Sequence, residues 1–491
     1  MTESADPGAP WRRLFTEPPR PGPVRRSVWG PWLAVGTVCI GAFMGQLDAS
    51  IVTVALPSIG RAFNAGLGAV EWVVLAYVVV LVSAVAPAGR LADSLGRKLL
   101  YTYGFAVFAA ASAGCAFSPS LGVLVLFRVL QGVGAVMLQA NSVALIREAA
   151  PHGRLGAAIG LQGTAQAVGL SAGPSVGGVL VAAGGWPLIF LINVPVGCVG
   201  LVLAWLLLPR SRHRVPASHI DVPGTALLAA SAACLLAALS LAVERGIAAV
   251  AVAGAAAAGA VLGAGAVLRQ RQHPGAVVDS VLLHRSGFVL GCASGLFAYG
   301  SLFGALVVVP FFLESGIGMT TQQVGLRVTG LPVVLAAVAP LGGRLSDWAG
   351  PRLPTVLGMV LTAAAFSLLA ASPVAALVPA LVIAGAGLGF YIPANNAAVI
   401  GAAPPSHAGS AGGLLNMTRG LGTALGVAVA SLVYGSIAGS AAHAGVVGAD
   451  QASAALRATA IVLAFAAAAA GVLTALRGGS DNEGDAGGDA G

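Results

Sequence analysis

Charged side chains are scarce in this sequence: they make up 9% of 491 residues, whereas 57% are hydrophobic. A soluble domain carries about 25% charged residues, so the composition excludes a soluble globular protein and indicates an integral membrane protein. The net charge of +8 does not indicate a nucleic-acid partner, because the basic residues are scattered along the chain. The five cysteines all lie within apolar runs without paired spacing, and we interpret them as small buried side chains.

Other absences narrow the function further. The sequence has no phosphate-binding loop of the kind that ATP-driven proteins use. It also has no combination of nucleophile and base, and no set of metal ligands, within reach of a common pocket. We therefore expect neither an enzyme nor a requirement for a cofactor or metal. No histidine falls within a predicted membrane span, so proton chemistry inside the membrane would depend on carboxylates.

Long apolar runs, in contrast, are abundant. A helix needs about 20 apolar residues to cross the hydrocarbon of a bilayer. Fourteen runs of that kind predict an all-α membrane protein, and they lie near residues 33–56, 72–92, 99–118, 121–143, 157–183, 186–208, 224–243, 248–268, 288–312, 322–342, 354–371, 375–399, 411–436 and 455–476.

The loops between these runs differ in charge. If the N-terminus is cytoplasmic, arginines concentrate in the cytoplasmic loops, as the positive-inside rule requires, and both termini are then predicted to be cytoplasmic. The flanking segments, a basic arm at 1–32 and an acidic, glycine-rich tail at 477–491, are predicted to be disordered.

One eight-residue segment occurs twice. GRLADSLG at 89–96 recurs as GRLSDWAG at 343–350, and Ala140-Asn141 recurs at the same offset as Ala394-Asn395. A constant displacement indicates duplication of a whole helical bundle in parallel orientation. We therefore predict two six-helix bundles in parallel repeat, 33–208 and 287–476, joined by a linker at 209–286 that contributes two extra spans.

The duplicated segments are candidate gating loops. Their glycines permit tight turns, and Asp93 could cap a helix start or pair with a neighbouring guanidinium. Such a cluster could hold one conformation and release another, or could only anchor the topology. The candidate residues are Gly89, Arg90, Asp93, Gly96, Arg97, Lys98, Gly343, Arg344, Asp347 and Gly350.

The fifth span carries small residues at four-residue steps, so one of its faces allows close approach of another helix. This face is predicted to form a hinge or seal between the two halves, or simply a close-packed contact. Its residues are Gly160, Gly169, Gly173, Pro174, Gly177 and Gly178, and Gln162 and Gln166 extend the face as possible substrate contacts.

Charged residues inside the spans are the strongest functional candidates. Asp48 lies within the first span, where burying a carboxylate costs on the order of 3 kcal/mol or more and therefore marks an ion or substrate pathway. Burial disfavours the charged form of a carboxylate, so Asp48 could exchange a proton near neutral pH. Glu314, at the end of the ninth span, is the second candidate.

Basic and amide side chains complete the set. Arg128 in the fourth span must face the bundle interior or reach toward the interface, and Gln131 shares its helix face as a possible substrate contact. Asn416 and Arg419, three residues apart in the thirteenth span, are further candidate substrate contacts.

Together these features resemble the major facilitator superfamily and, within it, the fourteen-helix drug:proton antiporter family. Besides the duplicated loop, the resemblance depends on motifs at residues 47–57 (LDASIVTVALP), 128–134 (RVLQGVG), 160–178 and 186–197. It implies alternating access by rocking of two halves, a proton-binding Asp48 and an Arg128 that tunes or relays protonation. Glu314, where relatives commonly have glutamine, and Arg327 depart from the family pattern.

The sequence therefore predicts a monomeric antiporter in the bacterial cytoplasmic membrane, which exchanges protons for hydrophobic or amphiphilic drugs or antibiotics. Its partners would be protons, the substrate and the lipid bilayer, without nucleic acid. Two alternatives stay open: a proton symporter that imports a nutrient on the same fold, and a membrane receptor or scaffold that transports nothing.

Overall fold

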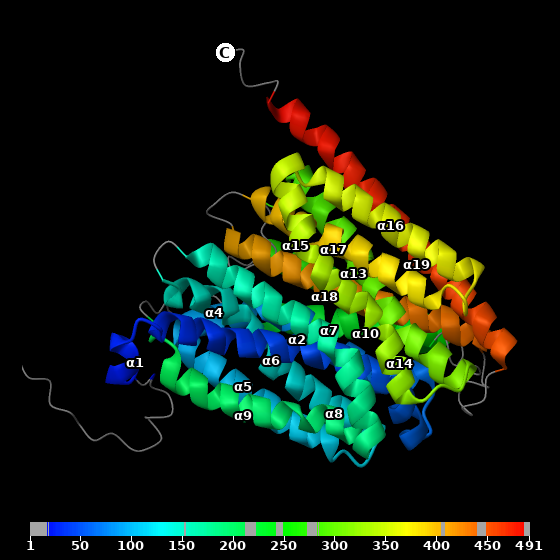
Figure 1. Ribbon diagram of the computed structural model, residues 1–491, viewed down its shortest axis with the longest axis horizontal. Coiled ribbons are helices and arrows are strands. Elements are labelled where there is room, and N and C mark those ends of the chain that lie inside the picture. The colour runs from blue at the N-terminus through cyan, green and yellow to red at the C-terminus, as the bar shows by residue number, and fades with distance from the viewer. Residues whose placement is uncertain are drawn as a thin grey trace, which may run out of the picture.

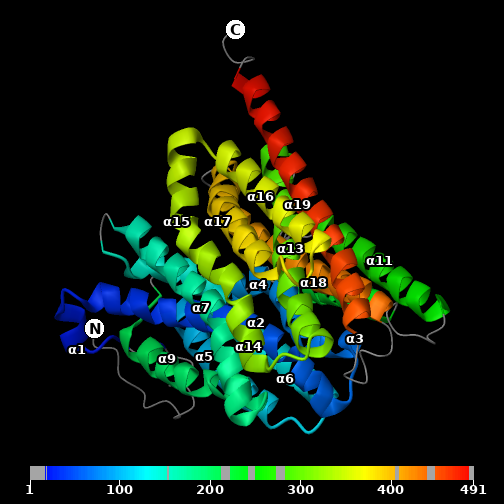
Figure 2. The ribbon, with the colours of Figure 1, turned by 45° about the vertical axis from the view of Figure 1, so that its right-hand side comes forward.

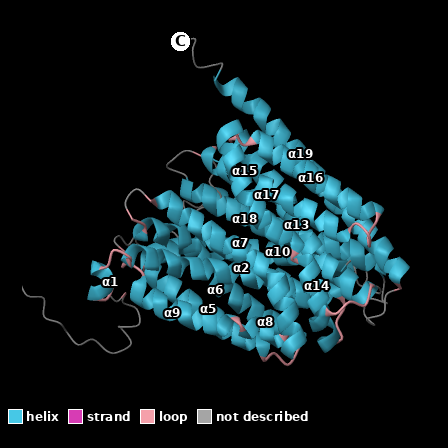
Figure 3. Ribbon diagram, viewed as in Figure 1, coloured by secondary structure: helices cyan, strands magenta, loops and turns pink. Residues whose placement is uncertain are grey.

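The computed structural model describes residues 17, 19–151, 154–211, 222–241, 249–272, 282, 284–403, 408–438 and 448–485. Within these residues the chain forms helices and connecting loops and no strand (Figure 3). Thirteen helical stretches in this part are long and apolar enough to cross a membrane. The remaining predicted span, 224–243, coincides with helix α10, of which only Ala226–Ala238 forms a shorter apolar stretch.

The first bundle consists of the helices that correspond to the first six predicted spans. They are α2 (Gly30–Phe63), α3 (Leu67–Val70), α4 (Trp72–Leu95), α5 (Arg97–Ala116), α6 (Leu121–Ala149), α7 (Leu155–Gly184), α8 (Pro187–Leu191) and α9 (Asn193–Leu207). Helices α2 and α7 pack along each other, as do α5 and α6, and α4 packs on α6.

Two linking helices and a second bundle follow. They are α10 (Val222–Leu241), α11 (Ala249–Gln272), α13 (Ser286–Phe311), the π-helix η2 (Phe312–Gly316), α14 (Thr321–Val328), α15 (Gly330–Ala349), α16 (Arg352–Ala371), α17 (Leu377–Gly401), α18 (Ala408–Ala438) and α19 (Ala449–Asp485). Helices α10 and α11 pack together, and α10 also contacts α4 and α18, one helix from each bundle.

The predicted loop at 89–98 is mostly helical. Helix α4 continues to Leu95, and the chain turns at the single residue Gly96, whose φ of 113° favours glycine. The second copy repeats this arrangement, with α15 ending at Ala349 and Gly350 at φ 77°. Hydropathy placed the helix ends too early, because the helices continue into polar residues. The N-cap of α5 is Gly96 rather than Asp93.

The terminal segments also contain ordered structure. Helix α1 (Gly22–Arg26) lies within the predicted disordered arm, and Glu17 is buried where its carboxylate accepts hydrogen bonds from the amide and hydroxyl of Ser211, each at 2.8 Å. Helix α19 continues to Asp485, past the position at which the sequence predicted a disordered tail. Ser211 in turn accepts a hydrogen bond from the amide of Arg97 at 2.8 Å, so the arm meets the α4–α5 turn.

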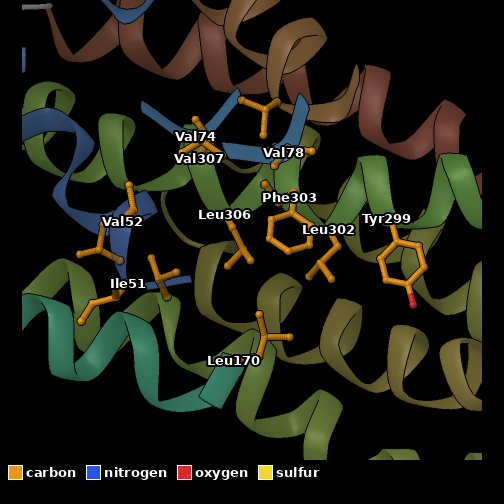
Figure 4. Packing of buried hydrophobic residues seen from close by; sticks show 14 of the residues in the cluster. Ile51, Val52, Val74, Val78, Leu170, Tyr299, Leu302, Phe303, Leu306 and Val307 are labelled. Carbon is orange, nitrogen blue, oxygen red and sulfur yellow. The ribbon is translucent and has the colours of Figure 1, made fainter. Parts of the chain in front are cut away.

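A hydrophobic core continues from one bundle into the other. Buried residues of α2, α4 and α7, such as Ile51, Val74 and Leu170, belong to the same cluster as Phe303 and Leu306 of α13 (Figure 4). The blue-to-teal helices of the first bundle lie beneath the yellow-to-red helices of the second in Figure 1. Figure 2 shows that α7 and α15 approach each other near α14 and diverge toward the end at which α7 begins.

The Gly96 end is where α4 turns into α5, and the Arg61 end is where Arg61 of α2 meets Glu314 of η2.

Candidate functional site

Asp48 lies near the middle of α2 and is completely buried. Its Oδ2 accepts a hydrogen bond from Nη1 of Arg128 at 2.6 Å, which makes a buried ion pair between α2 and α6. Its Oδ1 accepts hydrogen bonds from Nε2 of Gln131 at 2.8 Å and from Nδ2 of Asn193 at 3.1 Å. Three donors from two helices therefore satisfy both carboxylate oxygens of Asp48.

Arg128 is held from several sides. Its Nε donates to the carbonyl of Val73 at 2.6 Å, and its Nη1 also donates to Oε1 of Gln131 at 2.6 Å. The guanidinium lies over the ring of Tyr77, 4.4 Å from the centroid, which adds a cation–π contact. A buried arginine requires such compensation. Arg128 thus faces the bundle interior, which the sequence left open.

Local sequence explains how these side chains converge. Arg128 and Gln131 are three residues apart on α6, so they share a helix face. Asn193 begins α9 directly after a break in the sixth span. Pro195 lacks an N–H for the carbonyl of Leu191 and its ring crowds that carbonyl, so one continuous helix is disfavoured here. Asn193, at this junction, donates its hydrogen bond to Asp48.

A cavity lies between the two bundles, directly beside this cluster. It has a volume of about 50 Å³. Its lining includes Gln46, Tyr77 and Arg128 from the first bundle and Phe303, Asn416 and Arg419 from the second. Ligand pockets for drug-sized molecules measure roughly 300–1,000 Å³. The cavity is therefore contracted, and a large ligand would require the bundles to move apart.

Glu314 makes a different kind of contact. It belongs to η2, the π-helix that follows α13, and forms an ion pair with Arg61 of α2. The same Oε1 accepts a hydrogen bond from the hydroxyl of Thr321 at 3.0 Å, whereas the buried Oε2 has no hydrogen-bond partner among the described residues. This pair connects the two bundles at the Arg61 end.

The glycine face of α7 serves two contacts. A Cβ atom at Gly169 or Gly173 would overlap α2, where Gly173 lies against Ser50. Gly178, one turn further on, lies against the backbone of α14, and a Cβ atom at Gly325 of α14 would overlap the carbonyl of Pro174. Gly177 contacts Ile51 of α2. The first contact packs α7 within its own bundle, and the second joins the two bundles.

Hydrogen bonds extend the contact between the bundles. The hydroxyls of Ser175 and Thr329 lie 2.5 Å apart, and the hydroxyl of Ser171 donates to the carbonyl of Pro332 at 2.8 Å. These bonds join α7 to the α14–α15 segment.

The other predicted residues are distributed as follows. Gln131 and Gln162 are buried and Gln166 is half-buried, and none of the three lines the cavity. Arg97 pairs with Glu148 at 2.6 Å, Lys98 is buried, Gly89 and Gly343 are half-buried, and Arg344 and Asp347 are exposed. The side chains of Arg90 and Asp93, and the surroundings of Gly160, lie outside the described residues.

Sequence reasoning missed three contributors. Asn193 entered only as part of a motif, although an amide beside a helix-breaking Pro195 was a signal that it could turn into the bundle. Gln46 lies two residues before Asp48 and reaches Arg419, and Ser112 accepts a hydrogen bond from Gln131 at 2.8 Å. No local pattern distinguishes these two from ordinary polar residues in a span.

Two related helical bundles that enclose a cavity, with a buried ion pair beside it, define a multi-pass membrane transporter rather than an enzyme. The chain belongs to the Major Facilitator Superfamily, whose family model matches residues 38–283 and 291–488. This match confirms the predicted superfamily and its all-helical fold.

Named relatives are similar over most of the chain. Over 407 residues it is 31% identical to the riboflavin transporter RibZ of Clostridioides difficile (strain 630), a match that covers 82% of this chain and 88% of that protein. It is also 31% identical over 413 residues to the tetracenomycin C resistance and export protein of Streptomyces glaucescens, covering 83% and 77%.

Solved structures agree on the fold. The crystal structure of a bacterial homologue of the human lysosomal transporter Spinster, inward-facing and occupied, has a TM-score of 0.67 at 15% identity and covers 92% of this chain and 97% of that one. At this identity the likeness shows the fold alone.

Proposed function

We propose that this protein is a proton-coupled antiporter, which exports hydrophobic or amphiphilic drugs or antibiotics across the bacterial cytoplasmic membrane by alternating access. In this proposal both termini are cytoplasmic and the monomer is the working unit. The observation that carries it is the buried pair of Asp48 and Arg128 beside a cavity between two bundles. Relatives named for antibiotic resistance and export support the choice of substrate.

Proton binding at Asp48 would rearrange its surroundings. Oδ2 accepts one hydrogen bond and Oδ1 accepts two, all directed at the ionised carboxylate. A proton on Asp48 would remove the negative charge that these donors face, so the ion pair with Arg128 would weaken and the guanidinium could shift. Arg128 and the Tyr77 ring beneath it both line the cavity. Protonation would therefore alter the wall of the cavity, which is how one proton site could communicate with a substrate site.

The energy available is sufficient for export. A proton entering down 100 mV provides about 2.3 kcal/mol, and one pH unit adds about 1.36 kcal/mol. At one-to-one exchange these could sustain a roughly 400-fold gradient of a neutral substrate.

A second candidate is proton symport of a nutrient, which the relative named as a riboflavin transporter favours. Purified protein in vesicles that contain a pH-sensitive dye separates the two. When substrate is added outside, an antiporter exchanges it for lumenal protons and the lumen becomes alkaline, whereas a symporter makes the lumen acidic. A receptor or scaffold would change neither. Lumenal acidification, or no response with several amphiphilic compounds, would reject the antiporter.

A further inference from the structure

The charge of the cavity wall is unbalanced. Among the described residues that line the cavity there are two arginines, Arg128 and Arg419, and no aspartate or glutamate. Arg128 is neutralised by Asp48, which lies directly behind the wall. Arg419 has no carboxylate within ion-pair distance in the described part of the chain. The cavity therefore presents one uncompensated positive charge.

The partners of Arg419 are neutral instead. On the first bundle, its Nη2 donates to Oε1 of Gln46, and on its own bundle the guanidinium lies over the ring of Tyr299, 5.4 Å from the centroid. Figure 4 shows Tyr299 on the same helix as Phe303 and Leu306, with its hydroxyl directed away from the hydrophobic side chains. An amide oxygen is a weaker acceptor for a guanidinium than an anion is. The hydrogen bond to Gln46 is therefore one that an anionic ligand could replace.

The rest of the wall suits an amphiphile. Tyr77 and Phe303 provide aromatic faces, and Val74, Val78 and Leu81 provide aliphatic ones. Asn416 lies three residues before Arg419 on α18, so its amide shares the helix face of the guanidinium. A ligand that fits these groups has an apolar, aromatic body and one negatively charged oxygen group.

We propose that the central cavity selects amphiphilic organic anions, such as aromatic carboxylates or phenolates, and that Arg419 is the residue that binds the anionic group. The inference rests on the proposed transport function and specifies its substrate class. The anion replaces Gln46 at Arg419 and so breaks a hydrogen bond between the bundles, which couples occupancy of the cavity to their separation. A cationic drug would face the uncompensated charge of Arg419 and bind weakly.

Binding of three probes that share one ring system tests this assignment. The full-length protein in detergent is dialysed at neutral pH against 1-naphthoate, 1-naphthalenemethanol or 1-naphthylmethylammonium. We expect the wild type to prefer naphthoate. Because a hydrogen bond to a charged group contributes about 1.5–3 kcal/mol, Arg419→Gln should weaken naphthoate binding by about ten- to a hundredfold. The same substitution should change binding of the alcohol little.

Two further variants distinguish the contribution of charge to naphthoate binding from that of packing. Arg419→Lys keeps the charge and should retain most of the preference for naphthoate. Gln46→Ala removes the competing acceptor and should leave naphthoate binding equal or tighter. Equal binding of the three probes by the wild type, a preference for the ammonium probe, or a naphthoate preference that survives Arg419→Gln would overturn the assignment.

The anion site and the antiporter function can fail independently of each other. If the alcohol drives proton exchange in vesicles but naphthoate is not preferred, the substrate class is wrong and the antiporter stands. If naphthoate binds through Arg419 and none of the probes moves protons, the anion site stands and the antiporter is wrong.

Discussion

Asp48 and Glu314 each meet an arginine, but only one of these pairs lies inside a single bundle. Asp48 and Arg128 are both completely buried in the first bundle, with side-chain exposures of 0% and 1%. Glu314 is also buried, at 6%, yet its partner Arg61 is 51% exposed and belongs to the other bundle. A pair inside one rigid body can persist while the bundles rock, whereas a pair between bundles must break when they separate at that end.

We expect the two carboxylates to have different roles. We expect Asp48 to carry the proton, because its surroundings move with it as one body and change only when it is protonated. We expect Glu314 to stabilise contact at the Arg61 end, together with the glycine contacts of α7 and α14. The assignment would fail if both carboxylates responded alike to neutralisation.

The largest effect is expected from Asp48→Asn. Substrate-driven proton exchange in vesicles should fall at least about 100-fold, and the uncompensated charge of Arg128 should cost about 3–5 kcal/mol of stability. The matched variant Glu314→Gln should keep exchange within about threefold of the wild type. Equal losses in the two variants would show that the location of the pair does not matter.

A double-mutant cycle measures each pair directly. Arg128→Gln alone should destabilise the protein by about 3–5 kcal/mol, because it leaves Asp48 buried without its cation. In combination with Asp48→Asn the loss should be about 1–3 kcal/mol less than the sum. The corresponding cycle of Arg61→Gln and Glu314→Gln should give a coupling of about 1 kcal/mol or less, because Arg61 is half exposed and solvent screens the pair. Chemical unfolding in one detergent gives all four values.

These two pairs also show what sequence could and could not predict. The apolar runs and the duplicated loop predicted the fold. The cost of burying a charge in a span identified Asp48 and Arg128, but as separate candidates and not as a pair. Helical periodicity fixes the face of a residue on its own helix but not the neighbour it meets. The contacts of Asp48 with Asn193, and of Glu314 with Arg61, join helices whose relative placement is set by packing. Gln131 was interpreted as a substrate contact for the same reason, although it donates to Asp48.

An intermediate effect is expected where the bundles touch through backbone. Gly325→Ala would push a methyl group into the carbonyl of Pro174, and overpacking of this kind costs about 1–3 kcal/mol. The Arg61 end should therefore open more often. Cysteines introduced as Ser175→Cys and Thr329→Cys, in a variant whose native cysteines have been replaced, report on this opening. Their disulfide should form several-fold more slowly when Gly325→Ala is present than when it is absent. The control is Gly163→Ala on α7, where a Cβ atom meets nothing within 4 Å and the rate should not change.

The smallest effect is expected from Glu314→Gln. This variant also defines the role of the pair of Arg61 and Glu314 most directly. If Glu314 only holds the bundles together, neutralising it should lower stability by about 1 kcal/mol or less and accelerate opening at the Arg61 end. Arg61→Gln should also accelerate opening at the Arg61 end, and it should destabilise the protein more than Glu314→Gln does, because it leaves the buried Glu314 carboxylate without its cation. High salt should reproduce the change in the wild type, because it screens the exposed guanidinium, and should not affect either variant further. A shift in the pH dependence of exchange in Glu314→Gln would instead identify Glu314 as a second proton carrier and remove the distinction between the pairs.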